Sequence, residues 1–264
     1  MFTVVNKAST PCQVGGYFGV SIYDPAGHQL TATATREPGN QLEAGVQPIT
    51  LQPGGAASFT VTVNEIPDTG TSCPMIGAFH LTPPNATAFV QVSLSPSAHL
   101  YCGQPEVFPT QSIVQCTLSD LTVSAGPSGF GAGHQGVPIL FRNSSQTTCS
   151  LYGYPGVAAL NSSGQQVVQA MRTPSGYLGG LAPGATTPAT VILGPGQTAS
   201  ALVEGIDNPL NGATSCPYYP AFLVTPPNTT TSAQVPVASA SSQGMAGCTP
   251  IVVHPIVPGT RGSE

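Results

Sequence analysis

The chain has 264 residues, of which 31 are glycine and 28 are proline, while only 6% are charged. Five basic against ten acidic residues give a net charge of −5, which excludes a surface that tracks nucleic-acid phosphates. The glycine and proline content disfavours surface helices, the 40% hydrophobic share excludes a disordered chain, and no apolar run is long enough to span a membrane.

Short apolar runs separated by glycine, proline, asparagine and serine predict β-strands along the whole chain. The first predicted strand is Phe2–Asn6. In the second half the predicted strands are, in order, Leu118–Ser124, Val137–Asn143, Gly156–Leu160, Gln166–Ala170, Thr190–Leu193, Ala199–Glu204, Pro220–Thr225, Ala233–Ala238 and Ile251–His254. Because no segment without glycine or proline keeps a helical period over about ten residues, we expect few helices.

The chain contains an internal repeat. The segment Ser72–Thr87 recurs as Ser215–Thr230 with ten of sixteen positions identical, and Cys12–Tyr17 aligns with Cys149–Tyr154. The sequence therefore predicts two homologous domains, residues 1–110 and 111–257, followed by a polar tail at 258–264. Together they are predicted to form an all-β protein of two tandem immunoglobulin-like antiparallel β-sandwich domains.

Several motifs of the second copy resemble those of a known family. They are Cys116, Gly133-His134, Phe141-Arg142-Asn143, Cys149, the segment from Leu151 to Val157, the Gly164 turn, Leu193-Gly194-Pro195-Gly196, Cys216 and Cys248. This arrangement resembles the actinobacterial domain-of-unknown-function family 4232, over all of the second copy and most of the first. The resemblance implies an exported or lipid-anchored protein of the cell envelope, with no assigned activity.

The first copy departs from this pattern at its beginning. Phe2–Asn6 aligns with the second strand of copy two, so the counterpart of Cys116–Pro138 is absent. We expect the edge of Phe2–Asn6 to be filled by upstream residues, by Glu106–Pro109 or by a strand from another chain. A start set too late is the simplest explanation, and it would also account for the lack of a signal peptide. Copy one is expected to be less stable than copy two and to self-associate.

The cysteines predict a disulfide framework. The first hairpin of copy two brings Cys116 close to Cys149, which leaves Cys216 to pair with Cys248. By repeat symmetry Cys73 pairs with Cys102, and Cys12 is left as an unpaired thiol. Each bond stabilises the fold by about 3–4 kcal/mol and indicates a secreted or cell-envelope protein. The alternative is a set of reduced, buried thiols.

Two short segments match known catalytic or cofactor-binding motifs, but the residues around them do not fit those functions. Asp68–Thr71 matches the aspartic-protease signature, but the repeat replaces its carboxylate with Asn211, so a turn is predicted. Gly131–Gly136 matches the dinucleotide-binding pattern but precedes a strand instead of a helix, which predicts a hairpin loop. No histidine has a second ligand at metal spacing, the five being His28, His80, His99, His134 and His254. We expect no catalytic residue, metal or cofactor.

The predicted function is a non-catalytic structural or interaction module of the cell envelope. The alternative is a carbohydrate- or peptide-binding protein, with an envelope protein or a glycan as partner. Its candidate binding surface consists of aromatic residues at the corner loops, which could equally pack beneath them: Tyr152, Tyr154, Tyr177, Tyr17 and Phe18. Glycosylation-type sequons, which predict polar surface loops, begin at Asn85, Asn143, Asn161 and Asn228.

Overall fold

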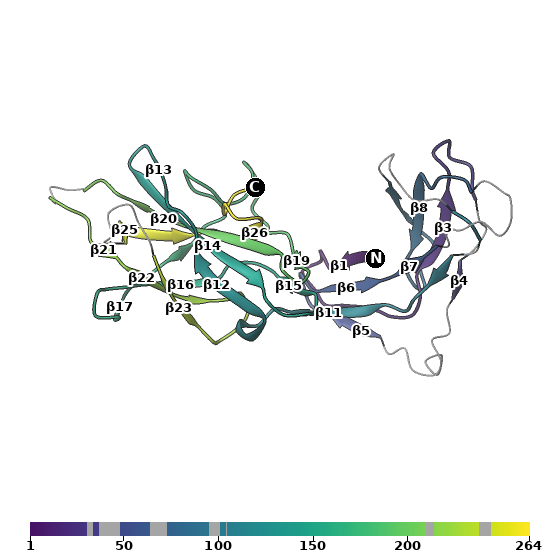
Figure 1. The fold of residues 1–264 in the computed structure, drawn as a ribbon, viewed down its shortest axis with the longest axis horizontal. Helices are drawn as coiled ribbons and strands as arrows, with labels where there is room; N and C mark the ends of the chain where they lie inside the picture. The colour runs from purple at the N-terminus through teal and green to yellow at the C-terminus, as the bar shows by residue number, and fades with distance from the viewer. Residues whose placement is uncertain are drawn as a thin grey trace. The chain divides into compact units, whose positions relative to one another are not determined.

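A computed structural model of the protein describes residues 1–30, 34–36, 48–63, 73–94, 101–103, 105–209, 214–237 and 244–264. The chain divides into two compact units, Met1–Ile113 and Val114–Glu264. The regular elements in these ranges are strands, apart from the short 3-10 turn η1 at Leu118–Asp120 (Figure 1). The prediction of an all-β protein is therefore confirmed.

Two main sheets form unit 2. The larger has the strand order β12 (Leu121–Ala125), β14 (His134–Asn143), β20 (Thr198–Ile206), β25 (Cys248–Val253) and β18 (Met171–Arg172), with β13 (Gly129–Gly131) on β14 and β26 (Val257–Pro258) on β20. The smaller has the order β17 (Gln166–Gln169), β16 (Gly156–Leu160), β22 (Ala221–Thr225) and β23 (Ala233–Pro236). Two short pairs complete the unit, β15 (Cys149–Leu151) with β19 (Val191–Leu193) and β21 (Tyr218–Tyr219) with β24 (Met245–Ala246).

The core of unit 2 draws apolar side chains from both of its main sheets. Ile139 and Phe141 of β14 and Phe222 and Val224 of β22 are all completely buried in one cluster. The buried residues are two positions apart in each strand, because successive side chains of a β-strand point to opposite faces and only one face points into the core. Burial of each such side chain is worth about 1.5–3 kcal/mol.

Unit 1 is built from smaller sheets. The first joins β1 (Phe2–Val5), β6 (Ala56–Phe59) and the beginning of β11 (Gln111–Gln115), and the second joins β3 (Gly19–Tyr23), β8 (Ala78–Thr82) and β9 (Val90–Ser93). The others are β4 (Thr35–Arg36), β10 (Glu106–Val107) and β7 (Val61–Thr62), and the pair β2 (Cys12–Val14) with β5 (Ile49–Leu51). Their core contains Phe18, Ile22, Phe59 and Phe79.

A buried asparagine marks the same place in both units. The Nδ2 of Asn6 donates to the carbonyls of Thr10 and Leu51, and the Nδ2 of Asn143 donates to those of Thr147 and Leu193. Asn143 is completely buried, so the prediction that its sequon lies in a surface loop is wrong. This side chain satisfies backbone carbonyls where one strand ends and the chain turns.

Two further expectations need correction. The predicted strand Leu118–Ser124 begins instead as η1, because the side chain of Asp120 accepts hydrogen bonds from Thr117 and caps the turn. The segment Glu106–Pro109 does not fill the edge of β1, since its β10 pairs with β4 and β7. The predicted polar tail contacts unit 2 through Gly262, whose N–H donates to the buried Ser200 hydroxyl.

Candidate functional sites

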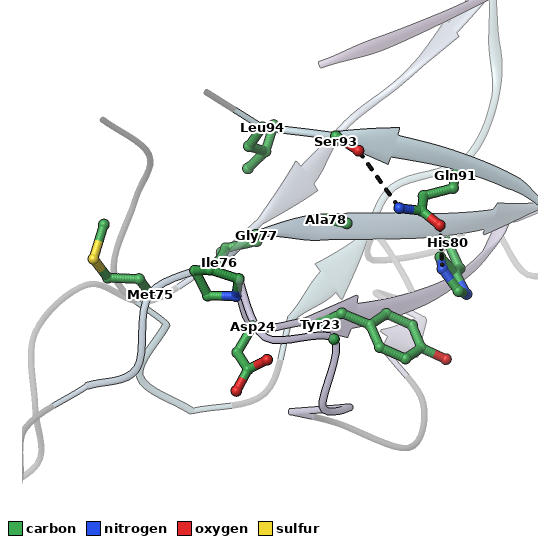
Figure 2. A pocket seen from close by; sticks show the side chains of 12 residues that line it. Tyr23, Asp24, Met75, Ile76, Gly77, Ala78, His80, Gln91, Ser93 and Leu94 are labelled. Carbon is green, nitrogen blue, oxygen red and sulfur yellow. Dashed lines mark hydrogen bonds between the residues drawn. The ribbon is translucent and has the colours of Figure 1, made fainter. Parts of the chain in front are cut away.

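A pocket of about 710 Å³ lies in unit 1, where β3, β8 and β9 come together (Figure 2). Tyr23 comes from the end of β3, His80 from β8, and Gln91 from β9, and Asp24 and Met75 line the pocket from the adjoining loops. The inward positions of these strands carry core residues, so the alternate residues are left to face outward.

Three rings, of which Tyr23 and His80 are half-buried and Phe89 is exposed, form a row beside this pocket. The ring of His80 lies between Tyr23, at 4.0 Å between centroids, and Phe89, at 4.1 Å, and it stacks on Phe89 at an interplanar angle of 12°. Phe89 is 54% exposed. We call Tyr23, His80 and Phe89 the aromatic row.

Polar groups accompany the aromatic row. Oε1 of Gln91 lies 3.3 Å from Nε2 of His80, and Nε2 of Gln91 donates to the hydroxyl of Ser93 (Figure 2). Asp24 accepts the backbone N–H of His28, and this hydrogen bond, the largest influence, lowers the pKa of the Asp24 carboxyl. A charged acceptor, an amide and a hydroxyl therefore surround the pocket.

The aromatic row is a property of unit 1 alone. The strand registers align Tyr23 with Leu160 and His80 with Leu223, because each pair occupies the same position in its sheet. Continuing the alignment, Phe89 corresponds to Ser232. The two units therefore have equivalent strands at this position, but only unit 1 carries aromatic rings on them.

The aromatic residues predicted from sequence differ in their burial. Phe18 is only 5% exposed and stacks on Phe59 within the core of unit 1, so the prediction that it lines a binding surface is wrong. Tyr17 is half-buried against the same core, whereas Tyr177 is 63% exposed. Tyr152 and Tyr154 are half-buried, and burial raises the pKa of the Tyr154 hydroxyl.

A second cluster, in unit 2, surrounds the buried carboxylate of Glu204. Nδ1 of His134 lies 2.8 Å from its Oε1, and Nε2 of His254 lies 3.2 Å from its Oε2. The backbone N–H groups of Tyr177 and Leu178 each donate to one of the two oxygens at 3.0 Å. From their spacing in the sequence neither histidine had a nearby partner. The pairing of β14 with β20 and of β20 with β25 brings both of them to Glu204.

The Glu204 cluster holds the loop that carries Tyr177. The loop comes so close that a Cβ on Gly176 would clash with Oε2 of Glu204 and with Nε2 of His254. On the far side of His254, its Nδ1 lies 3.1 Å from the Thr173 hydroxyl. Both carboxylate oxygens thus accept hydrogen bonds from the protein itself. The cluster is therefore better suited to a structural role, holding the Tyr177 loop in place, than to binding a substrate.

The cysteines pair as the sequence predicted. Disulfides join Cys73 to Cys102, Cys116 to Cys149 and Cys216 to Cys248, while Cys12 is exposed and unpaired. Three disulfides are typical of a protein that folds in an oxidising, extracellular type of environment.

Thiol titration provides a direct check of this framework. The unfolded but unreduced protein is expected to react at one thiol per chain, because Cys12 alone lacks a partner. Peptide mapping of the alkylated protein should locate the label on Cys12. A disulfide between Cys12 and Cys73 or Cys102 would contradict the expected pairing.

No metal site and no membrane-spanning helix is found in the described parts of the chain. There, no three His, Cys, Asp or Glu side chains are grouped so as to hold an ion, and no helix has the length and apolarity needed to cross a bilayer. The Gly131–Gly136 segment lies in a β-hairpin: Gly131 ends β13, Ala132 and Gly133 form the turn, and His134 begins β14. His99 and the Asp68–Thr71 motif lie outside the described residues.

These features define a class: a disulfide-bonded, all-β protein of two repeated units. The model of the domain of unknown function DUF4232 matches residues 1–111 and 116–256, so the chain belongs to that family and contains two tandem copies of its domain. No curated protein and no solved structure matches the chain.

Proposed function

We propose that the protein is a non-catalytic, exported or cell-envelope binding module, and that it binds a carbohydrate on the aromatic row of unit 1. The observation that carries the proposal is the row of contacting rings Tyr23–His80–Phe89, with Phe89 exposed at its end, beside a pocket of about 710 Å³. The apolar C–H face of a sugar ring packs on an aromatic ring, and nearby polar groups then bind its hydroxyls.

The polar groups of the pocket suit binding better than hydrolysis. Glycoside hydrolysis usually needs two carboxyl groups facing each other across the scissile bond. In the described lining of this pocket Asp24 is the only carboxylate, and it already accepts hydrogen bonds from His28. Gln91 and Ser93 can donate and accept at once, as sugar hydroxyls require.

A glycan array of soluble cell-wall fragments, followed by titration of any fragment that binds, tests the proposal. Tyr23→Ala and Phe89→Ala are each expected to weaken binding by about three- to tenfold, the usual contribution of one aromatic contact. Tyr177→Ala serves as a matched control, because Tyr177 is 63% exposed but belongs to unit 2, so its loss should not affect binding.

Other outcomes would replace this proposal. Loss of binding in Tyr154→Ala but not in Phe89→Ala would locate the site at the corner loops of unit 2. Binding of peptides without any glycan would favour the peptide-binding alternative. Release of shorter sugars, abolished by Asp24→Asn, would show that the module is an enzyme.

A further inference from the structure

The outer face of the larger sheet of unit 2 carries apolar side chains that lie outside its core. In β14, Ile139 and Phe141 point into the core, and successive side chains of a strand point to opposite faces. Pro138 and Leu140 therefore lie on the outer face, where the register places Leu202 of β20 beside Pro138. These three side chains line a pocket of about 400 Å³, a volume in the usual range for small-molecule sites. We call this pocket the outer-face groove.

Three segments of unit 2 enclose the outer-face groove. The β13 hairpin contributes Phe130, the loop that follows β18 contributes Leu178, and the segment after β26 contributes Arg261. Backbone hydrogen bonding joins the last two segments, since the N–H of Gly180 donates to the carbonyl of Gly262. All of the described lining belongs to unit 2, so the groove shares no residue with the aromatic row or its pocket.

The Glu204 cluster positions one side of the outer-face groove. The N–H of Leu178 donates to Oε2 of Glu204 at 3.0 Å, and Glu204 lies opposite Gly136 of β14. A Cβ on Gly136 would lie 3.1 Å from Cδ1 of Leu178 and 3.2 Å from both Cδ atoms of Leu202, so these side chains already pack closely over the glycine. The Leu178 side is therefore held by a hydrogen bond and by packing, which makes the groove a preformed feature of the fold.

Arg261 gives the outer-face groove a positive charge. It is the one charged residue in the described lining and one of only five basic residues in the chain. Its side chain is exposed, and within the described parts of the chain no ion pair or hydrogen bond engages its guanidinium. Residues 210–213 and 238–243, the parts of unit 2 outside the described residues, contain no aspartate or glutamate and cannot neutralise it. Because the guanidinium fork matches a carboxylate, charge complementarity favours a ligand with that group.

We propose that the outer-face groove binds a free fatty acid, with its alkyl chain along the apolar floor and its carboxylate paired with Arg261. The floor extends from Leu140 to Gly136, about 13 Å along β14 at about 3.3 Å per residue, which is close to the length of an extended decanoate chain. Burial of the alkyl chain supplies affinity, and Thr260, which also lines the groove, offers a hydroxyl to the carboxylate. Phe130 is 57% exposed beside the groove, and a bound chain would cover part of its ring.

Isothermal titration calorimetry of the full chain with three ten-carbon probes tests the proposal, each probe being kept below its micellar concentration. Decanoate is expected to bind the chain. Decyltrimethylammonium should bind at least about tenfold more weakly, because it places a cation beside Arg261. Decanol, which has the same chain without a charge, should lie between the two. Equal affinities for decanoate and decyltrimethylammonium would overturn the proposal.

Substitutions of Arg261 test the ionic contact, and the fold should be retained because this side chain is exposed. Arg261→Ala is expected to weaken decanoate binding at least about tenfold and to leave decanol binding unchanged. Arg261→Lys keeps the charge and should retain more of the affinity for decanoate. Arg172→Ala is the matched control, because Arg172 is also an exposed arginine of unit 2 but does not line the groove.

Phe130→Ser tests the apolar part of the site. Because both probes carry the same chain, it should weaken decanoate and decanol binding by the same factor, about three- to tenfold. No binding of decanoate to the unsubstituted chain, or equal binding to Arg261→Ala, would overturn the proposal. It would also be overturned if the chain floated with phosphatidylglycerol vesicles in an Arg261-dependent manner without binding decanoate, because the occupant would then be a membrane surface. None of these results depends on the glycan array, since the groove lies in unit 2.

Discussion

Replacing Glu204 with glutamine is expected to lower the free energy of unfolding of unit 2 by about 3–5 kcal/mol, the usual effect of breaking a buried ionic network. The Glu204 side chain is 4% exposed and accepts from His134, His254 and two backbone N–H groups. A glutamine NH₂ group would place a donor opposite donors and leave them without an acceptor. Urea denaturation followed by hydrogen exchange of β14 and β20 peptides measures the loss.

The same experiment has a predicted pH dependence. Burial raises the pKa of Glu204, but the hydrogen bonds from Leu178, His254 and Tyr177 outweigh it, so the folded pKa lies below its ordinary value. A lowered carboxyl pKa contributes stability that is present above the unfolded pKa, about 4.3, and is lost as pH falls through the folded value. The difference between wild type and Glu204→Gln should therefore shrink below about pH 4.

Glu264→Gln is the matched control for this variant. Glu264 also accepts a backbone N–H, that of Ala182, but its side chain is exposed. Its replacement should change the stability of unit 2 by no more than about 0.5 kcal/mol at any pH. Equal effects of the two substitutions would show that the Glu204 cluster makes no special contribution to the stability of unit 2.

Removing the Cys116–Cys149 disulfide is expected to destabilise unit 2 by about 3–4 kcal/mol, because the bond joins residues 33 apart and restricts the unfolded chain. Alanine is the better replacement, since both cysteines are buried and serine would add unpaired hydroxyls. Urea denaturation of Cys116→Ala/Cys149→Ala under non-reducing conditions measures the effect.

Cys12→Ala is the natural control for the disulfide variant. Cys12 is the repeat equivalent of Cys149 but is exposed and unpaired, so its loss should leave stability within about 0.5 kcal/mol of wild type. A large loss in Cys12→Ala would mean that this thiol has a bonded partner in the folded protein.

The sequence by itself determined the fold class, the duplication and the cysteine pairing. Strands such as Gly156–Leu160 could be predicted because short apolar runs end at glycine, proline or asparagine, which are the residues that turns require. The match between Ser72–Thr87 and Ser215–Thr230 showed that the two domains are homologous, so the cysteine pairing predicted for the second could be applied to the first. A disulfide between Cys116 and Cys149 followed from the hairpin between them.

Only the tertiary structure decided where polar and aromatic side chains meet. His134 lies on β14, Glu204 on β20 and His254 directly after β25, so the three are far apart in the sequence. No local pattern in the sequence shows that the register of β14 on β20 and of β20 on β25 brings them together. The aromatic row is likewise assembled across β3 and β8, with Phe89 just before β9. Composition also could not separate the buried Phe18 from the exposed Phe89, because both lie just before a strand and their exposure depends on how the folded chain packs around each ring.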